Sequence, residues 1–121
     1  MENRLTSYKD LHVWQRSMDL VVEIYRLVKK LPKEETYALS DQMHRAAISI
    51  PSNISEGYSR KSTSEYLNFL SIANGSRTEL ETQLLICKRI QYLSDTETEE
   101  AFALIDEIGK MLYRIMNNLK K

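Results

Sequence analysis

Apolar residues recur three or four positions apart through almost the whole of this 121-residue chain, a spacing that gathers them on one face of a helix. Four such segments follow one another, at about residues 9–31, 36–56, 63–93 and 96–119. Only three glycines and two prolines are present, which favours short connections between long helices. Short connections make successive helices antiparallel. The sequence therefore predicts one all-α domain over residues 1–121, an antiparallel up-down four-helix bundle.

Three sequence signals mark expected helix ends. Ser62 with Glu65, and Ser94 with Glu97, have the spacing of a capping box, in which each side chain bonds the backbone N–H of the other residue. Gly57 stands at the expected end of the second helix, where glycine is a common cap. These signals support the helix bounds independently of the apolar pattern.

The first segment carries two apolar rows, although a monomeric bundle needs only one. We assign to the core the row that contains Trp14, Met18 and Tyr25. Apolar surface beyond one core in a small bundle often faces another subunit, so the remaining row predicts homo-oligomerisation. The predicted oligomer interface comprises Val13, Leu20, Ile24, Leu27, Leu104 and Met111. The alternative is that these wide apolar faces belong to the core.

The chain lacks the residue patterns of known catalytic and metal sites. A di-iron bundle needs two Glu-x-x-His pairs, whereas the nearest match here is the single Asp41-Gln-Met-His44. No P-loop, dinucleotide-binding fingerprint or Gly-x-Ser-x-Gly motif occurs. Cys87 lies in an apolar run, which predicts a buried, reduced thiol. We therefore expect no enzymatic activity, no cofactor, no metal and no small-molecule substrate.

The distribution of charge gives only a local indication of nucleic-acid binding. Lysine plus arginine and aspartate plus glutamate each number 17, so binding to nucleic acid would need a local patch. Arg77 and Lys88 share one face of the third helix, and Lys110, Arg114 and Lys121 share one face of the fourth. Such clusters contact phosphates, and tyrosines can stack on unpaired bases. The alternative is that these cations pair within the chain or complement a helix dipole.

Membrane and secretion signals are absent from the pattern. No segment reaches the roughly 20 apolar residues that a membrane-spanning helix needs. The first residues lack the apolar stretch of a signal peptide. We expect a cytoplasmic protein with no membrane partner.

Three blocks of the sequence carry a family resemblance. They are Tyr8-Lys-Asp-Leu-His-Val-Trp14-Gln, Gln42-Met-His-Arg45-Ala-Ala-Ile-Ser-Ile-Pro51-Ser-Asn53-Ile-Ser-Glu56-Gly57-Tyr-Ser-Arg60 and Glu65-Tyr-Leu-Asn-Phe-Leu-Ser-Ile-Ala-Asn-Gly75-Ser76-Arg-Thr-Glu79-Leu. Together they resemble the bacterial four-helix-bundle family named for proteins encoded in intervening sequences of 23S ribosomal RNA genes. This resemblance implies an antiparallel bundle, assembly as a homopentamer and no established enzymatic activity.

The family is distantly similar to the accessory protein of diversity-generating retroelements, which implies RNA or an RNA-processing protein as a partner. That relative is markedly basic, whereas this chain is neutral. Resemblance and spacing together predict a polar or nucleic-acid-binding surface that comprises Arg45, Asn53, Glu56, Arg60, Lys61, Arg77 and Lys88. The alternative for these residues is bonding between helix ends. The alternative for the chain is a protein–protein interaction module with no nucleic-acid role.

Overall fold

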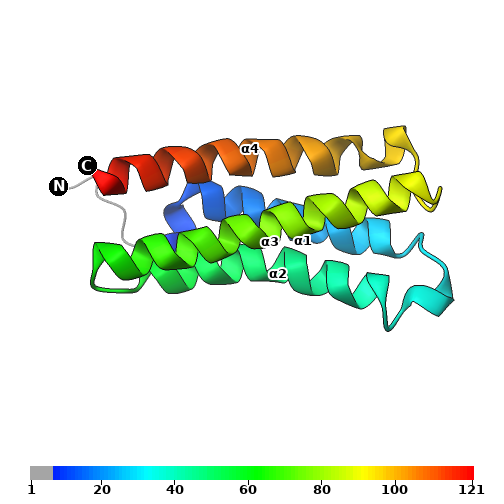
Figure 1. Ribbon diagram of the computed structural model, residues 1–121, viewed down its shortest axis with the longest axis horizontal. Helices are drawn as coiled ribbons and strands as arrows, with labels where there is room; N and C mark the ends of the chain where they lie inside the picture. Colours follow the sequence, from blue (N-terminus) through cyan, green and yellow to red (C-terminus); the bar gives the residue numbers. More distant parts are fainter. Residues whose placement is uncertain (1–6) are drawn as a thin grey trace.

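Four helices form the computed structural model, which describes residues 7–121 (Figure 1). The elements are η1 (Tyr8–Asp10), α1 (His12–Val28), η2 (Lys33–Glu35), α2 (Leu39–Tyr58), α3 (Thr63–Arg89) and α4 (Asp95–Lys120), where η1 and η2 are single turns of 3-10 helix. No strand occurs among residues 7–121. The prediction of an all-α protein with four helices is confirmed.

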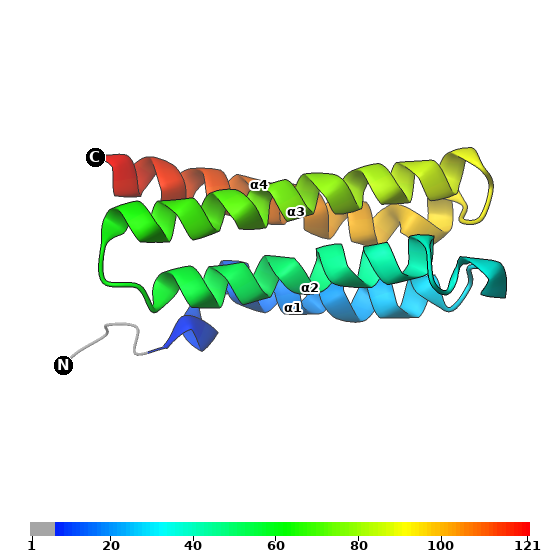
Figure 2. The ribbon, with the colours of Figure 1, turned by 60° about the horizontal axis from the view of Figure 1, so that its bottom comes forward.

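The helices lie around a square, with α1 and α3 each packed against both α2 and α4 (Figures 1 and 2). Contacts between α2 and α3 pair residues in opposite chain order. Met43 meets Cys87 (3.8 Å between the sulfurs), and the hydroxyls of Ser49 and Ser76 lie 2.7 Å apart. Figures 1 and 2 show that the α2–α3 connection and the C-terminal end of α4 lie at one pole of the bundle.

The core corrects the predicted oligomer interface. Five of its six residues are at most 4% exposed and form the centre of the bundle: Val13, Leu20, Ile24, Leu27 and Leu104. Met111 alone is half-buried at the edge of the core. These five side chains contact the other helices of their own chain, so they are not available to a second subunit.

The row of α1 that we expected in the core lies at its rim instead, with Met18 40% and Tyr25 43% exposed. Two adjacent rows on one helix share the same period, so the period does not show which row faces inward. Ser17 also conceals the true core row. It is fully buried within that row and donates a 2.6 Å hydrogen bond to the carbonyl of Val13.

One predicted cap is confirmed in full. The Ser94 hydroxyl accepts from the N–H of Glu97 (3.1 Å), and the Glu97 carboxylate accepts from the N–H of Ser94 (2.9 Å). The Gly57 cap is wrong, because α2 continues past it to Tyr58. A Cβ at Gly57 would lie 2.7 Å from the Cβ of Phe69, so this glycine lets α2 and α3 approach closely.

Other helix ends differ from the predicted bounds by up to four residues. α1 ends at Val28, ahead of Pro32, whose ring disfavours a helical residue before it. α3 ends at Arg89, and Gln91 adopts a left-handed backbone (φ 67°) that reverses the chain toward α4. The chain turns into these connections before the apolar pattern ends, so α1 and α3 are shorter than predicted.

Candidate nucleic-acid interface

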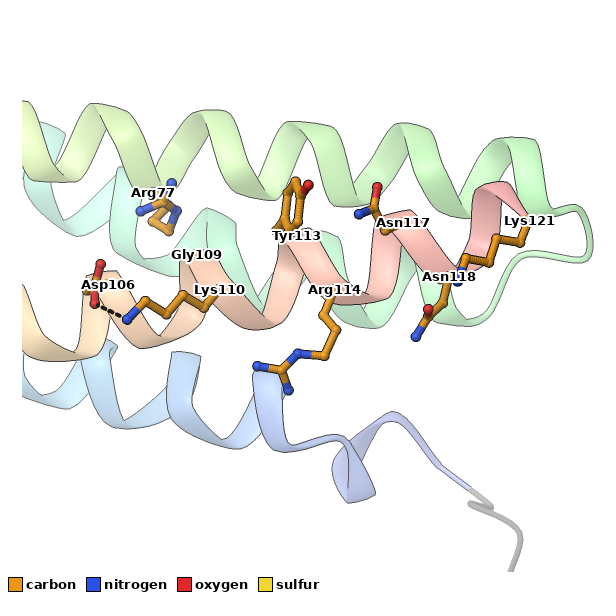
Figure 3. A pocket seen from close by; sticks show the side chains of 9 residues that line it. All are labelled: Arg77, Asp106, Gly109, Lys110, Tyr113, Arg114, Asn117, Asn118 and Lys121. Carbon is orange, nitrogen blue, oxygen red and sulfur yellow. Dashed lines mark ion pairs between the residues drawn. The ribbon is translucent and has the colours of Figure 1, made fainter.

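A groove runs along the C-terminal half of α4, beside the middle of α3, and has a volume of about 520 Å³ (Figure 3). We call it the α4 basic groove, and it is lined by Arg77, Asp106, Gly109, Lys110, Tyr113, Arg114, Asn117, Asn118 and Lys121. Eight of these nine residues belong to the last turns of α4 or follow them directly. Only Arg77 comes from α3. The fold is thus needed to complete the set.

Helical spacing sorts the α4 residues of the groove into two rows. Lys110 and Arg114 are four residues apart and share one row, while Tyr113 and Asn117 share the next. Figure 3 shows Tyr113 and Asn117 pointing toward α3 and Arg114 pointing toward α1. The groove therefore presents a cationic row alongside a row with an aromatic ring and an amide.

Arg77 reaches α4 because residue 109 is glycine. A Cβ at Gly109 would lie 2.7 Å from both Cζ and Nη1 of Arg77. The guanidinium donates to the side-chain oxygen of Asn74 (2.9 Å) and to the carbonyl of Ile105 (3.2 Å). Arg77 is thereby fixed at the wall of the groove in one orientation.

The charge of the groove is positive. Its four cationic side chains face one carboxylate, Asp106, which lies 3.2 Å from Lys110 Nζ on the same helix face. Arg114 and Lys121 form no ion pair with any of residues 7–121. Exposed cations without partners can bind phosphate or carboxylate groups from outside the chain.

The other predicted surface residues lie elsewhere, and most are bonded locally. Arg45 pairs with Asp41 one turn away at 3.0 Å, and Asn53 donates to the Ser49 carbonyl at 2.8 Å. Lys61 is exposed in the α2–α3 connection. These contacts join neighbouring turns within α2 and do not connect helix ends, which was the predicted alternative.

Arg60 and Lys88 are likewise engaged within the chain. Arg60 pairs with Glu56 and lies 4.9 Å above the ring centroid of Phe69. Lys88 lies 2.9 Å from Asp95 and 5.1 Å from the ring centroid of Phe102 on α4. Of the seven predicted surface residues, Arg77 alone lines the α4 basic groove.

Sequence analysis missed five of the nine residues of the groove, among them Asp106 and Asn118. The spacing of Lys110, Arg114 and Lys121 was recognised, but Gly109, Tyr113 and Asn117 were not. Tyr113 is 70% exposed, which is unusual for a large ring on an amphipathic helix. Its position between two cationic residues of the adjoining row was a signal that could have identified it.

The histidine and the cysteine considered for chemistry have structural surroundings. His44 stacks on Tyr25, with ring centroids 4.1 Å apart. Cys87 is fully buried, as predicted, and burial raises the pKa of its thiol to about 11, so it stays protonated at neutral pH. Residues 7–121 bring together no group of three histidine, cysteine or carboxylate side chains suited to a metal ion. Within the same residues, no helix has the length and apolar character needed to cross a membrane.

Comparison with known proteins places this bundle in a family. A model of the 23S rRNA-intervening sequence protein family matches residues 9–114. Among curated proteins, no match is found. The crystal structure of a protein of unknown function from the S23 ribosomal protein family of Bacteroides thetaiotaomicron superimposes with a TM-score of 0.80 and 30% sequence identity. That alignment covers 86% of this chain and 97% of the other. The chain therefore belongs to the 23S rRNA-intervening sequence protein family.

Proposed function

We propose that this chain is a non-enzymatic, homo-oligomeric protein of the cytoplasm that binds RNA through its α4 basic groove. The observation that carries the proposal is the group of four cationic side chains around a single carboxylate that is already paired. Lysine and arginine contacts to phosphate supply most of the sequence-independent affinity for nucleic acid. The family's name refers to 23S rRNA, which makes RNA the first ligand to test.

The test is a salt series of RNA binding, measured by fluorescence anisotropy with a labelled single strand of about 12 nucleotides. Affinity should fall steeply as salt rises from about 50 to about 300 mM, because each phosphate contact contributes about 0.7 to the log–log slope. The double variant Lys110→Gln/Arg114→Gln should lower that slope by about 1.4 and weaken binding at least about tenfold at low salt.

A matched control removes the same charge from another part of the bundle. Lys29→Gln/Arg45→Gln acts on exposed residues at the end of α1 and on α2, and α2 does not contact α4 among residues 7–121. Its affinity for RNA should stay within about twofold of the wild type. If both double variants lost RNA affinity equally, the loss would be explained by net charge and not by the α4 basic groove. Absence of RNA binding at low salt would overturn the proposal, and equally tight binding of poly-glutamate would point to an acidic protein partner.

Two separate apolar patches support the proposed assembly. The α1–α2 patch surrounds a groove of about 310 Å³, and the α3 patch lies toward the C-terminal end of α3. The α1–α2 patch comprises Tyr8, Trp14, Met18, Val21, Ile48, Pro51 and the neighbouring Val22, which is 70% exposed. The α3 patch comprises Leu85, Ile86 and Ile90, each 44–50% exposed. A ring, such as the homopentamer that the resemblance implies, joins two different patches of successive copies.

Light scattering on purified protein tests the assembly. Val22→Glu in the α1–α2 patch and Leu85→Glu in the α3 patch should each give monomers, because each places a charge in the proposed contact. An equal mixture of the two variants retains one intact type of interface and should form dimers but no rings. A wild-type chain that is monomeric at micromolar concentration would contradict assembly. Loss of assembly in only one variant would indicate a symmetric dimer instead.

A second candidate function is a protein–protein interaction module without a nucleic-acid role. The same two apolar patches, each of which contains exposed side chains, favour it because they do not depend on the α4 basic groove. Assembly in light scattering combined with no RNA binding at low salt is the result that this candidate predicts.

A further inference from the structure

We propose that the α4 basic groove selects single-stranded RNA, with Tyr113 stacked on an unpaired base while Lys110 and Arg114 hold the neighbouring phosphates. This inference rests on the proposed RNA binding. It goes further by naming the form of the RNA and the side chain that contacts the base.

Tyr113 is an aromatic ring without a structural task. It is 70% exposed and takes part in no hydrogen bond or ring contact with any of residues 7–121. Five of the other six tyrosines are engaged, as when Tyr25 stacks on His44 or the Tyr92 hydroxyl donates to Glu35 at 2.9 Å. The sixth, Tyr37, is exposed but lies outside the groove. An exposed ring beside cations is the arrangement with which proteins stack single-stranded bases.

The two rows of the groove fit the two sides of one nucleic-acid strand. Neighbours in a row are four residues apart and therefore rise about 6 Å along the helix. Lys110 and Arg114 form a row of cations for the phosphates, and Tyr113 and Asn117 form a parallel row turned toward α3 (Figure 3). The Asn117 amide can both donate to and accept from the edge of a base. A single strand laid along α4 would meet both rows at once.

Arg77 lies at the wall of the α4 basic groove, on the side where Tyr113 would contact a base. Its guanidinium is held over Gly109 by the Asn74 side chain and the Ile105 carbonyl, so the cation is ordered before RNA arrives. A fixed cation beside the stacking ring adds charge attraction at the wall of the groove.

Duplex RNA does not fit this arrangement. In an A-form helix the bases are stacked on one another, and its deep, narrow major groove does not admit side chains. Tyr113 would then find no open base face, and only the cationic row would contribute. The groove should therefore prefer a single strand over a duplex of the same sequence.

The test compares Tyr113→Leu and Tyr113→Phe with the wild type, using the labelled single strand described above. Tyr113→Leu removes the flat ring and should weaken binding about tenfold, whereas Tyr113→Phe should stay within about twofold. The slope of affinity against salt should not change in either variant, because no phosphate contact is lost. Tyr37→Leu, at a tyrosine that is 95% exposed and outside the groove, is the matched control and should leave binding unchanged.

Two further probes separate stacking from phosphate contact. An abasic oligomer keeps the phosphates and removes the bases, so it should bind the wild type about tenfold more weakly than RNA and bind Tyr113→Leu equally weakly. The proposal is overturned if wild-type protein binds the abasic oligomer or the duplex as tightly as the single strand. In that outcome a steep salt dependence would still uphold phosphate binding. No binding of any probe at low salt would overturn both proposals together.

Discussion

The two halves of α4 carry opposite charge, and the bundle uses the two sets of charge differently. Three acids of the first half form ion pairs with residues outside α4, with N–O distances of 2.9–3.6 Å: Lys88–Asp95, Lys30–Glu97 and Arg16–Glu107. In the second half, Lys110 pairs only with Asp106 on its own helix, and Arg114 and Lys121 have no ion pair among residues 7–121. The acids bind the helices of one chain together, whereas the cations face outward.

This difference gives a chain with no net charge a locally cationic surface. Neutrality counts all 34 charged side chains equally, since 17 are basic and 17 are acidic. A ligand instead meets only the charges that neighbouring helices leave unpaired. Four predictions test whether the first half of α4 serves stability and the second half serves binding.

The largest effect is expected from charge reversal in the second half. Lys110→Glu/Arg114→Glu replaces two attractive contacts by two repulsive ones and should weaken RNA binding by about 100-fold or more in low salt. The helix should persist, because both side chains are exposed at the end of the bundle. Anisotropy measures the affinity, and circular dichroism checks the helix content. A similar loss in Lys29→Glu/Arg45→Glu, which lies outside α4, would attribute the effect to net charge instead of to the second half of α4.

The next effect concerns the cap at the start of the first half. Ser94→Ala removes the hydroxyl that accepts from Glu97 N–H and should lower the free energy of unfolding by about 1 kcal/mol. Ser71→Ala, at an exposed serine inside α3, is the control and should be neutral or slightly stabilising. Urea denaturation measures both variants. Unchanged stability of Ser94→Ala, or a change in its RNA affinity, would contradict the assignment of this half to stability.

Two glycine substitutions give a smaller contrast. Gly75→Ala should raise the free energy of unfolding by up to about 1 kcal/mol, because alanine favours a helix and nothing lies within 4 Å of the new methyl. Gly109→Ala should gain the same propensity but displace Arg77 from the Ile105 carbonyl, a hydrogen bond of about 1 kcal/mol, so its net stability should hardly change. Only Gly109→Ala should weaken RNA binding, by about threefold. Equal behaviour of the two variants in urea denaturation and anisotropy would show that Arg77 does not need the glycine.

The smallest effect is a pH dependence in the first half. Bonding to the backbone N–H of Ser94 is the main cause that lowers the pKa of Glu97 below its ordinary value of 4.5, and the charge of Lys30 adds to it. A carboxyl group with a lowered folded-state pKa stabilises the protein above its unfolded-state pKa, and this contribution disappears as pH falls through the folded-state pKa. The difference in urea midpoint between wild type and Glu97→Gln should therefore be present at neutral pH and vanish in acid. A difference that persists in acid would contradict this assignment.

The helices could be predicted from the sequence because their signals are local. Apolar spacing located all four, and the Ser94–Glu97 cap needs only residues that are neighbours in the chain. The inward face of α1 could not be predicted, since its two apolar rows have the same period and the buried Ser17 interrupts the correct one. Choosing between the rows requires knowing which helices lie on either side.

The candidate groove was predictable only in part, for a similar reason. The shared face of Lys110 and Arg114 follows from helical spacing, whereas the arrival of Arg77 from α3 depends on tertiary packing. Most other predicted cations are neutralised by carboxylates one turn away, as Arg45 is by Asp41, or across a connection, as Lys88 is by Asp95. Sequence shows where charges are placed but does not show which of them remain unpaired.

The contact between Arg77 and Gly109 has an evolutionary consequence. The guanidinium occupies the space that any side chain at residue 109 would fill, at 2.7 Å from an added Cβ. Selection on either position therefore acts on both. We expect related chains to keep arginine and glycine together at these two places or to lose both together, so that this pair marks the members whose groove is retained.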